Sequence, residues 1–167
     1  MKNLLKVLVA IAIVSLFSFN EANAQISIGG GVAYATGISN IGISVNGEYA
    51  INDDWDAAAG FTYFLKKGYL NWSALDLDAH YNFTEASFGK IYGIAGLNVL
   101  FASYKIPTVD LGAFGSYGGN YSSSSVGLNL GIGTKIAMSD KLAIAPEVKY
   151  AIGSGYLQIG AKILFGL

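Results

Sequence analysis

The sequence contains no cysteine and no arginine, and it has a single histidine. The absence of cysteine excludes a disulfide framework and a thiolate metal site, and it is compatible with an oxidising compartment. Because His80 is the only histidine, any histidine-dependent enzyme must use that residue. The formal net charge of −1 excludes the strongly basic surface by which proteins bind nucleic acids.

Charged residues of either sign are also scarce. They make up 13% of the chain, about half the usual share, whereas glycine accounts for 22 residues. A short water-soluble domain normally covers its surface with charged side chains. The composition therefore argues against a domain that is surrounded by water.

The N-terminal segment has the pattern of a cleaved signal peptide. Lys2 and Lys6 precede an apolar stretch over residues 7–19, and Ala22-Asn23-Ala24 is a small-x-small cleavage site. The alternative, an uncleaved membrane anchor, is less favoured because the apolar stretch is shorter than the roughly 20 residues that a spanning helix needs. We expect a signal peptide at residues 1–24 and one domain at residues 25–167.

After this segment, apolar residues alternate with small or polar ones, which is the period of β-strands. Residues 126–138 show the pattern most clearly, and no segment has a helical period. Turn-forming residues separate the alternating segments. The predicted fold is therefore all-β, an eight-stranded antiparallel up-and-down barrel. Its predicted strands cover residues 25–35, 42–51, 55–65, 72–83, 90–102, 125–138, 142–152 and 156–167.

The residue types on the two faces of these strands indicate which face contacts lipid. The apolar face carries no charge in any strand, as the lipid face of a membrane barrel requires. The other face is rich in glycine and other small residues, which suits the crowded interior of a narrow barrel. Pro146 lies inside a predicted strand and predicts a bulge or a locally lost hydrogen bond.

The aromatic residues predict two belts at the two membrane interfaces. With the N-terminus in the periplasm, one group is expected at the periplasmic rim: Tyr49, Trp55, Tyr81, Phe83, Tyr92 and Phe165. The other group is expected at the outer rim: Tyr34, Tyr63, Phe101, Tyr104, Tyr150 and Tyr156.

The chain resembles the small eight-stranded outer-membrane barrels of the OmpX and OmpA type, including the "outer membrane protein beta-barrel domain" proteins common in Bacteroidetes. The resemblance rests on the cleavage site before Gln25, the strand from Leu142 to Tyr150, and the amphipathic C-terminal strand that ends with residues 163–167. It implies a location in the cell outer membrane. The implied partners are outer-membrane lipid and, during biogenesis, chaperones and the barrel-assembly machinery. We expect a monomer.

Ionisable residues on the inward face form a candidate polar network in the lumen. Asp76 and Lys149 are expected at similar depth, with Lys135 nearer the periplasmic end. We interpret the network as structural, because unpaired charge in a narrow lumen is costly. A proton or ion path is the alternative. The predicted members are Glu48, Asp76, Asp78, His80, Lys135, Glu147, Lys149 and Lys162.

The longest predicted connection, residues 103–124, is a candidate extracellular interaction loop. Lys105, Asp110, Tyr117 and Tyr121 lie in it, next to a run of serines. Tyrosine, serine and glycine combine rigid rings with adaptable hydrogen-bonding groups, as binding loops do. A loop without any partner is the alternative.

The sequence favours a structural or surface-interaction role, such as adhesion or envelope integrity. A narrow channel, or a conduit for small apolar molecules, is the alternative. We expect no enzymatic activity, because no nucleophile lies near His80 at the spacing used by outer-membrane lipid A deacylases. We expect no cofactor and no metal site.

Overall fold

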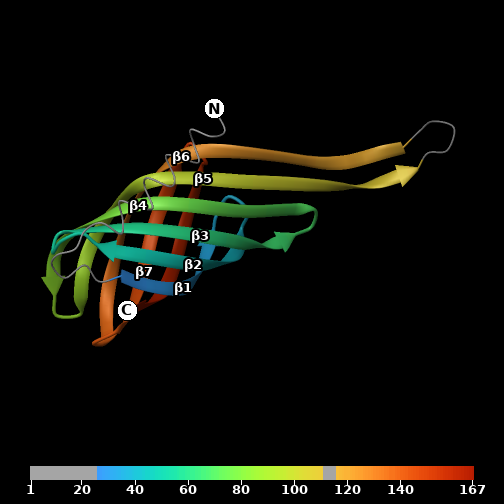
Figure 1. The fold of residues 1–167 in the computed structure, drawn as a ribbon. Coiled ribbons are helices and arrows are strands. Elements are labelled where there is room, and N and C mark those ends of the chain that lie inside the picture. Colours follow the sequence, from blue (N-terminus) through green and yellow to red (C-terminus); the bar gives the residue numbers. More distant parts are fainter. Residues whose placement is uncertain (1–25, 111–115) are drawn as a thin grey trace, which may run out of the picture.

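The structure is a computed structural model, and it describes residues 26–110 and 116–167. The predicted signal peptide lies outside the described residues. The described chain forms a closed barrel in which each strand pairs antiparallel with the next, and the last strand pairs with the first (Figure 1). Within these residues, no helix is long and apolar enough to cross a membrane. The predicted all-β barrel is thereby confirmed.

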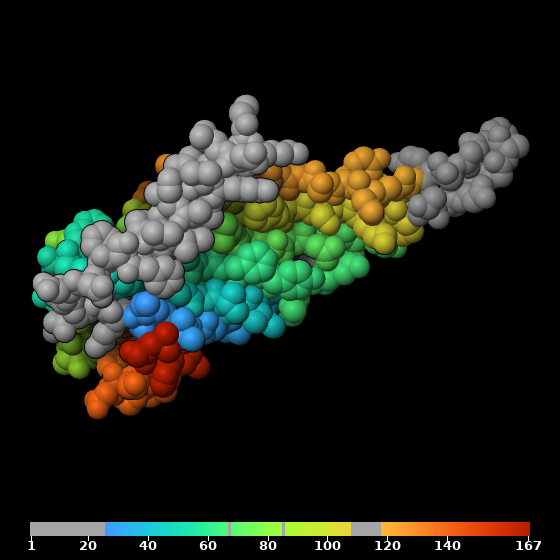
Figure 2. All heavy atoms as spheres, viewed as in Figure 1, coloured from blue at the N-terminus to red at the C-terminus, as the bar shows by residue number. Residues whose placement is uncertain are grey.

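The eight strands lie around the barrel in the order in which they occur in the chain. β5 and β6 are much longer than the others and project past them (Figures 1 and 2). The strands are β1 Ile26–Ala35, β2 Asn40–Ala50, β3 Trp55–Lys67, β4 Leu70–Ala86, β5 Gly89–Asp110, β6 Ser116–Ser139, β7 Leu142–Ile152 and β8 Tyr156–Gly166.

The prediction of a loop over residues 103–124 is wrong for most of that segment. β5 continues to Asp110 and β6 starts at Ser116, so the segment is a β-hairpin. The two strands stay paired from Ser103 with Ser122 to Ile106 with Gly119. The glycines and serines that suggested a loop are tolerated because each strand satisfies the other's backbone groups.

The two faces of each strand differ as predicted. Leu130 and Ile132 on β6 point outward and are each 53% exposed, while Asn129, the residue before Leu130, is buried in the barrel. In β2, Val45 is exposed and its neighbour Ser44 is buried. A chain with this inside-out arrangement keeps its apolar face for lipid and its polar face for the lumen.

Two aromatic residues that were predicted for the rims lie inside the barrel instead. Tyr92 has no exposed surface and Tyr156 is 1% exposed. Both have the same parity as inward residues of their strands, Asn98 on β5 and Lys162 on β8. Strand alternation therefore overrides the preference of tyrosine for the membrane interface.

Pro146 interrupts the pairing between β6 and β7, as expected. The described pairs stop at Gly133 with Glu147 and resume at Ile136 with Ile144, with no change of register. Proline has no N–H to donate, so pairing is lost locally on this side. On its other side, Pro146 still lies opposite Ala161 of β8.

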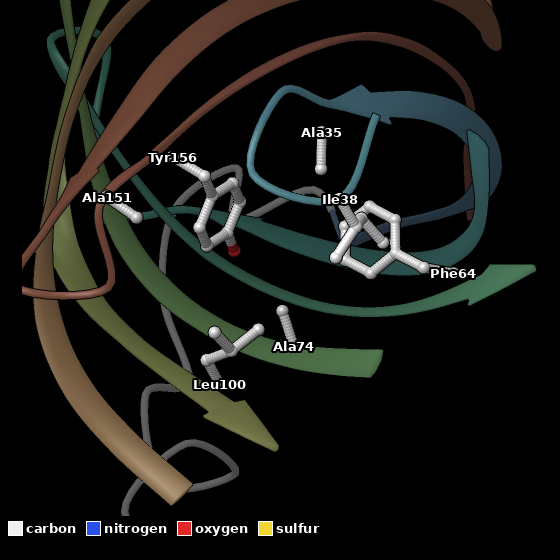
Figure 3. Packing of buried hydrophobic residues seen from close by; sticks show 7 residues of the cluster. All are labelled: Ala35, Ile38, Phe64, Ala74, Leu100, Ala151 and Tyr156. Carbon is white, nitrogen blue, oxygen red and sulfur yellow. The ribbon is translucent and has the colours of Figure 1, made fainter. Parts of the chain in front are cut away.

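An apolar cluster packs inside the barrel at the end from which β5 and β6 project (Figure 3). Tyr156 packs edge-on against Phe64, with ring centroids 6.4 Å apart, and lies 6.1 Å from Trp72. The cluster consists of Ala35, Ile38, Phe64, Ala74, Leu100, Ala151 and Tyr156, with Leu70 and Trp72 packed against it. Burial of these side chains places an apolar layer across this end of the lumen.

Candidate functional site

An ion cluster around Lys149 lies in the lumen next to the apolar cluster, and we call it the upper cluster. The Lys149 Nζ atom lies 2.7 Å from Asp76 Oδ2 and 3.1 Å from Asp78 Oδ2. Asn129 donates hydrogen bonds to Asp76 and Asp78, at 2.9 and 2.8 Å. Asn98 donates to Asp76 at 2.7 Å. The two carboxylates are thus held by one ammonium group and two amides.

Asn98 also connects this cluster to the apolar layer. Its Nδ2 atom donates to the hydroxyl of Tyr156 at 3.0 Å, and its Oδ1 atom accepts a 2.8 Å hydrogen bond from Ser154. The hydroxyl of Tyr156 therefore faces the polar cluster while its ring packs in the apolar one. This explains why a tyrosine lies inside the barrel at this level.

A second ion cluster, which we call the lower cluster, lies in the lumen farther from the apolar cluster. Lys162 Nζ lies 2.7 Å from Glu48 Oε1 and 2.6 Å from Glu147 Oε1. Lys135 Nζ lies 2.8 Å from Glu48 Oε2 and 3.1 Å from Asp56 Oδ2. Glu48 is therefore shared by two lysines, each of which also contacts a further carboxylate.

His80 belongs to the lower cluster and is 1% exposed. Its ring stacks on Tyr92, with centroids 4.6 Å apart and planes inclined by 21°. Tyr92 in turn donates a 2.7 Å hydrogen bond to Glu147 Oε1. The imidazole nitrogens face the two glutamates, with Nδ1 3.9 Å from Glu48 and Nε2 4.0 Å from Glu147.

All eight residues predicted to line the lumen take part in these contacts, in two clusters and not one. Sequence reasoning missed Asp56, which is buried beside Lys135. Alternation along β3 from Asp56 to Phe64 was the signal that placed it inside. Tyr92 was also missed, because it was assigned to the rim.

Glycines on neighbouring strands make room for the large inward side chains. Gly31 lies opposite Lys162, Gly131 opposite Lys149, and Gly133 opposite Tyr92. A Cβ atom on Gly131 would lie 2.5 Å from the Val148 carbonyl oxygen and 2.6 Å from Lys149 Cβ. The inward glycines thus follow from the size of the ionic side chains that they face.

The lumen opens widely at the end opposite the apolar cluster. A vestibule of about 710 Å³ lies there, among the short turns, with Glu48, Asp56 and Lys135 in its lining. A much smaller cavity of about 30 Å³ lies between the two ion clusters and is lined by Asp76, Glu147, Lys149 and Lys162, among others. This is space for a water molecule or two.

The projecting part of β5 and β6 is paired only within itself. Pairing of β5 with β4 ends at Tyr104, followed by one hydrogen bond from the Lys105 N–H to the Tyr69 carbonyl, and pairing of β6 with β7 begins at Leu128. A one-residue shift follows Ile106, next to Pro107, which cannot donate a hydrogen bond. Lys105 and Tyr121 are exposed there. The side chains of Asp110 and Tyr117 lie outside the described part of the structure.

Comparisons with known proteins identify the fold of this chain but not its family. No family model matches the sequence, and no match is found among curated proteins. The N-terminal β-barrel domain of OprF from Pseudomonas aeruginosa is similar, with a TM-score of 0.65, 13% identity and coverage of 88% of this chain and 100% of that one. The fold is that of a small eight-stranded outer-membrane β-barrel.

Two further structures show how little this fold says about function. Ail, the attachment invasion locus protein of Yersinia pestis, has a TM-score of 0.57 at 17% identity, covering 86% of this chain and 95% of that one. A de novo designed transmembrane β-barrel has the same TM-score at 12% identity, covering 89% and 100%. A function for this chain must therefore be argued from its own residues.

Proposed function

We propose that the chain is an integral outer-membrane protein whose barrel supports a surface-exposed interaction hairpin. The barrel exterior is dominated by exposed apolar side chains, and its backbone groups are paired in a closed sheet, as the bilayer requires. The observation that carries the proposal is the hairpin of β5 and β6, which extends beyond the pairing with β4 and β7. Surface interaction is the use that such an extension serves best.

The orientation follows from the projecting hairpin, because the other described connections are short at both ends of the barrel. Outer-membrane barrels have short periplasmic turns and longer extracellular connections. The turns at residues 51–54, 87–88 and 140–141 lie at the vestibule end, together with the C-terminal residue Leu167, whose N–H donates to Ile26. The hairpin leaves the opposite end, so it points away from the cell.

The hairpin offers two recognition features. Residues 116–127 of β6 pair with β5 on one side and have no strand partner on the other among the described residues. A free strand edge recruits a strand of another protein by backbone hydrogen bonds. Exposed serines at residues 122–124 and the 61% exposed Tyr121 add adaptable polar contacts next to this edge.

The alternative role, a channel or conduit, is less well supported by the lumen. Ion pairs of Lys162 and Lys149 bridge side chains from different strands, and the apolar cluster lies above them. A strand number of eight usually leaves an interior that side chains occupy. We infer that the lumen supports the barrel and does not conduct.

The orientation is testable because the chain has no cysteine. Ser122→Cys and Asp140→Cys place single thiols at exposed positions near opposite ends of β6. In intact cells, a membrane-impermeant maleimide should label Ser122→Cys and should label Asp140→Cys only after the outer membrane is permeabilised. The reverse pattern, or recovery of the protein in the soluble periplasmic fraction, would refute the proposal.

The interaction role is testable by shortening the hairpin. Residues 106–119 are replaced by Asn-Gly, which joins the paired residues Lys105 and Asn120 through a two-residue turn. Cells that carry the shortened barrel should attach less to epithelial cells or matrix-coated plates than cells with the full chain. Equal attachment, with equal amounts of folded barrel, would rule out the hairpin as the interaction element.

The free edge is tested separately with two neighbouring proline variants. Successive N–H groups of a strand point to opposite sides, so only one of Ser123 and Ser124 donates toward β5. Proline at the other position removes a donor from the free edge alone. That variant should lose attachment while the hairpin stays folded.

A further inference from the structure

Three donors of the lower cluster are arranged as ligands of a metal ion. One carboxylate oxygen each from Glu48 and Glu147 and one nitrogen of His80 all lie within 4.8 Å of one another. Ligand atoms around a tetrahedral zinc ion stand roughly 3.4 Å apart, given metal–ligand distances of about 2.1 Å. Nδ1 of His80 faces Glu48 at 3.9 Å and Nε2 faces Glu147 at 4.0 Å, so one ion can take only one of the two nitrogens. The three donor atoms, which lie within 4.8 Å of one another, must therefore move closer together when an ion binds.

The imidazole is held in place yet lacks a full set of partners. His80 stacks on Tyr92, and its buried Nδ1 atom has no hydrogen-bond partner. Both oxygens of Glu48, in contrast, contact ammonium groups, at 2.8 Å from Lys135 and 2.7 Å from Lys162. A buried nitrogen without a partner is costly. A metal ion satisfies such a lone pair directly.

The charges of the two clusters do not balance. Within the described ion pairs, three lysines face five carboxylates, which gives −2 with His80 neutral. An uncompensated charge of this size is unfavourable in a narrow interior. One divalent cation brings the sum to zero.

The lumen also has a route for the ion and a place for the group it displaces. Glu48 lines the open vestibule, so an ion that enters from the periplasmic end reaches a ligand directly. Lys162 now bridges the two glutamates, and it borders the 30 Å³ cavity that Asp76 also lines. If its ammonium group moves there, the upper cluster gains a second cation for its two carboxylates.

We propose that Glu48, His80 and Glu147 form a binding site for one divalent transition-metal ion of the zinc class, which displaces the ammonium group of Lys162. One imidazole and two carboxylates are ligands that zinc accepts. Tyr92 orients both His80 and Glu147 and supports the site from outside, as partners of metal ligands commonly do. The site is separate from the hairpin and does not depend on its role.

The wild-type chain provides the first test, because it contains one histidine. A tag-free barrel is refolded in detergent with ¹⁵N-labelled histidine, which gives a single set of imidazole signals. Zinc chloride should shift the signal of one ring nitrogen in proportion to a one-to-one complex. Imidazole signals that change with pH but not with zinc would overturn the site.

Variants then assign the ligands and the competing ammonium group. In calorimetric titrations, His80→Gln should weaken zinc binding at least tenfold, and Lys162→Met should strengthen it by a similar factor because the competing cation is gone. Asp54→Asn, an exposed turn variant, is the matched control and should bind as the wild type does. Equal affinity of wild type and His80→Gln would overturn the proposal.

Discussion

Single residues in this barrel are chosen largely by the space that the lumen allows. The large inward side chains of Lys149, Lys162 and Tyr92 each face a glycine on a neighbouring strand. Glycine normally weakens a strand, because it costs more backbone entropy than other residues. Here its lack of a side chain lets an ionic or aromatic group cross the lumen.

Gly131→Ala is therefore expected to destabilise the barrel by about 1–3 kcal/mol, as overpacking does. The new methyl group would collide with the Val148 carbonyl and Lys149. Gly47→Ala is the matched control, because a Cβ atom there meets nothing within 4 Å. Urea unfolding in lipid vesicles measures both. Equal effects of the two changes would contradict the space argument.

Lys162→Met leaves Glu147 without its ammonium partner, so a loss of about 3–5 kcal/mol in the free energy of unfolding is expected for a dry site. The small cavity beside Lys162 reduces this value if water enters. Adding Glu147→Gln should recover part of the loss, since Glu48 keeps Lys135. Lys66→Met, at an exposed position, is the control and should be neutral. Strictly additive effects would mean that Lys162 and Glu147 are not coupled.

At the scale of the element, β6 combines two environments in one strand. Its second half, from Leu128, lies between β5 and β7 and presents apolar residues to the outside. Its first half pairs with β5 alone and is rich in serine, glycine and tyrosine. The change of composition along β6 coincides with the change of surroundings, from lipid to water.

A lysine should therefore have opposite consequences at the two halves of β6. Leu130→Lys puts a charge on the lipid face and is expected to cost about 2–4 kcal/mol near the bilayer midplane. Ser122→Lys, on the projecting half, should leave the free energy of unfolding unchanged within about 0.5 kcal/mol. Unfolding in vesicles compares them. An unchanged stability of Leu130→Lys would show that the assignment of faces is wrong.

For the molecule as a whole, the arrangement along the barrel axis is a sequence of three layers. The open vestibule is followed by the ion clusters, and the apolar cluster lies at the end where the hairpin begins. Ions that enter from the vestibule meet fixed charges first and an apolar layer afterwards. Both layers oppose a steady current.

We expect little or no stable single-channel conductance in planar bilayers. Lys162→Met should stay non-conducting as well, because the apolar cluster is intact in that variant. A wild-type chain with steady conductance, and with an ion selectivity that Glu147→Gln changes, would show that the lumen is a pore.

Much of this architecture was predictable because β-strands have a period of two. Alternation in residues 126–138 gave the lipid face and the lumen face of β6, and both agree with the exposure of Leu130 and the burial of Asn129. The same rule, applied strictly, would have placed Tyr92, Tyr156 and Asp56 inside. The preference of tyrosine for membrane interfaces made the rim the expected place for Tyr92 and Tyr156, and Asp56 lies next to a turn, at the second position of its strand.

The length of the hairpin was not predictable from the same pattern. Residues 116–127 show no sharp alternation, since both faces of a two-stranded extension contact water and neither must be apolar. Serine and glycine there look like a loop in the sequence. Their strand conformation comes from pairing with β5, which is an interaction between segments.

The sequence by itself determined the barrel, its strand order and the sides on which charge is absent, because these depend on local alternation and turn residues. The tertiary structure alone decided which charges meet. The division of the lumen into a Lys149 cluster and a Lys162 cluster depends on strand register, and so does the position of His80 between two glutamates. Register is set by pairing around the closed sheet, and a shift of one residue would exchange the two faces.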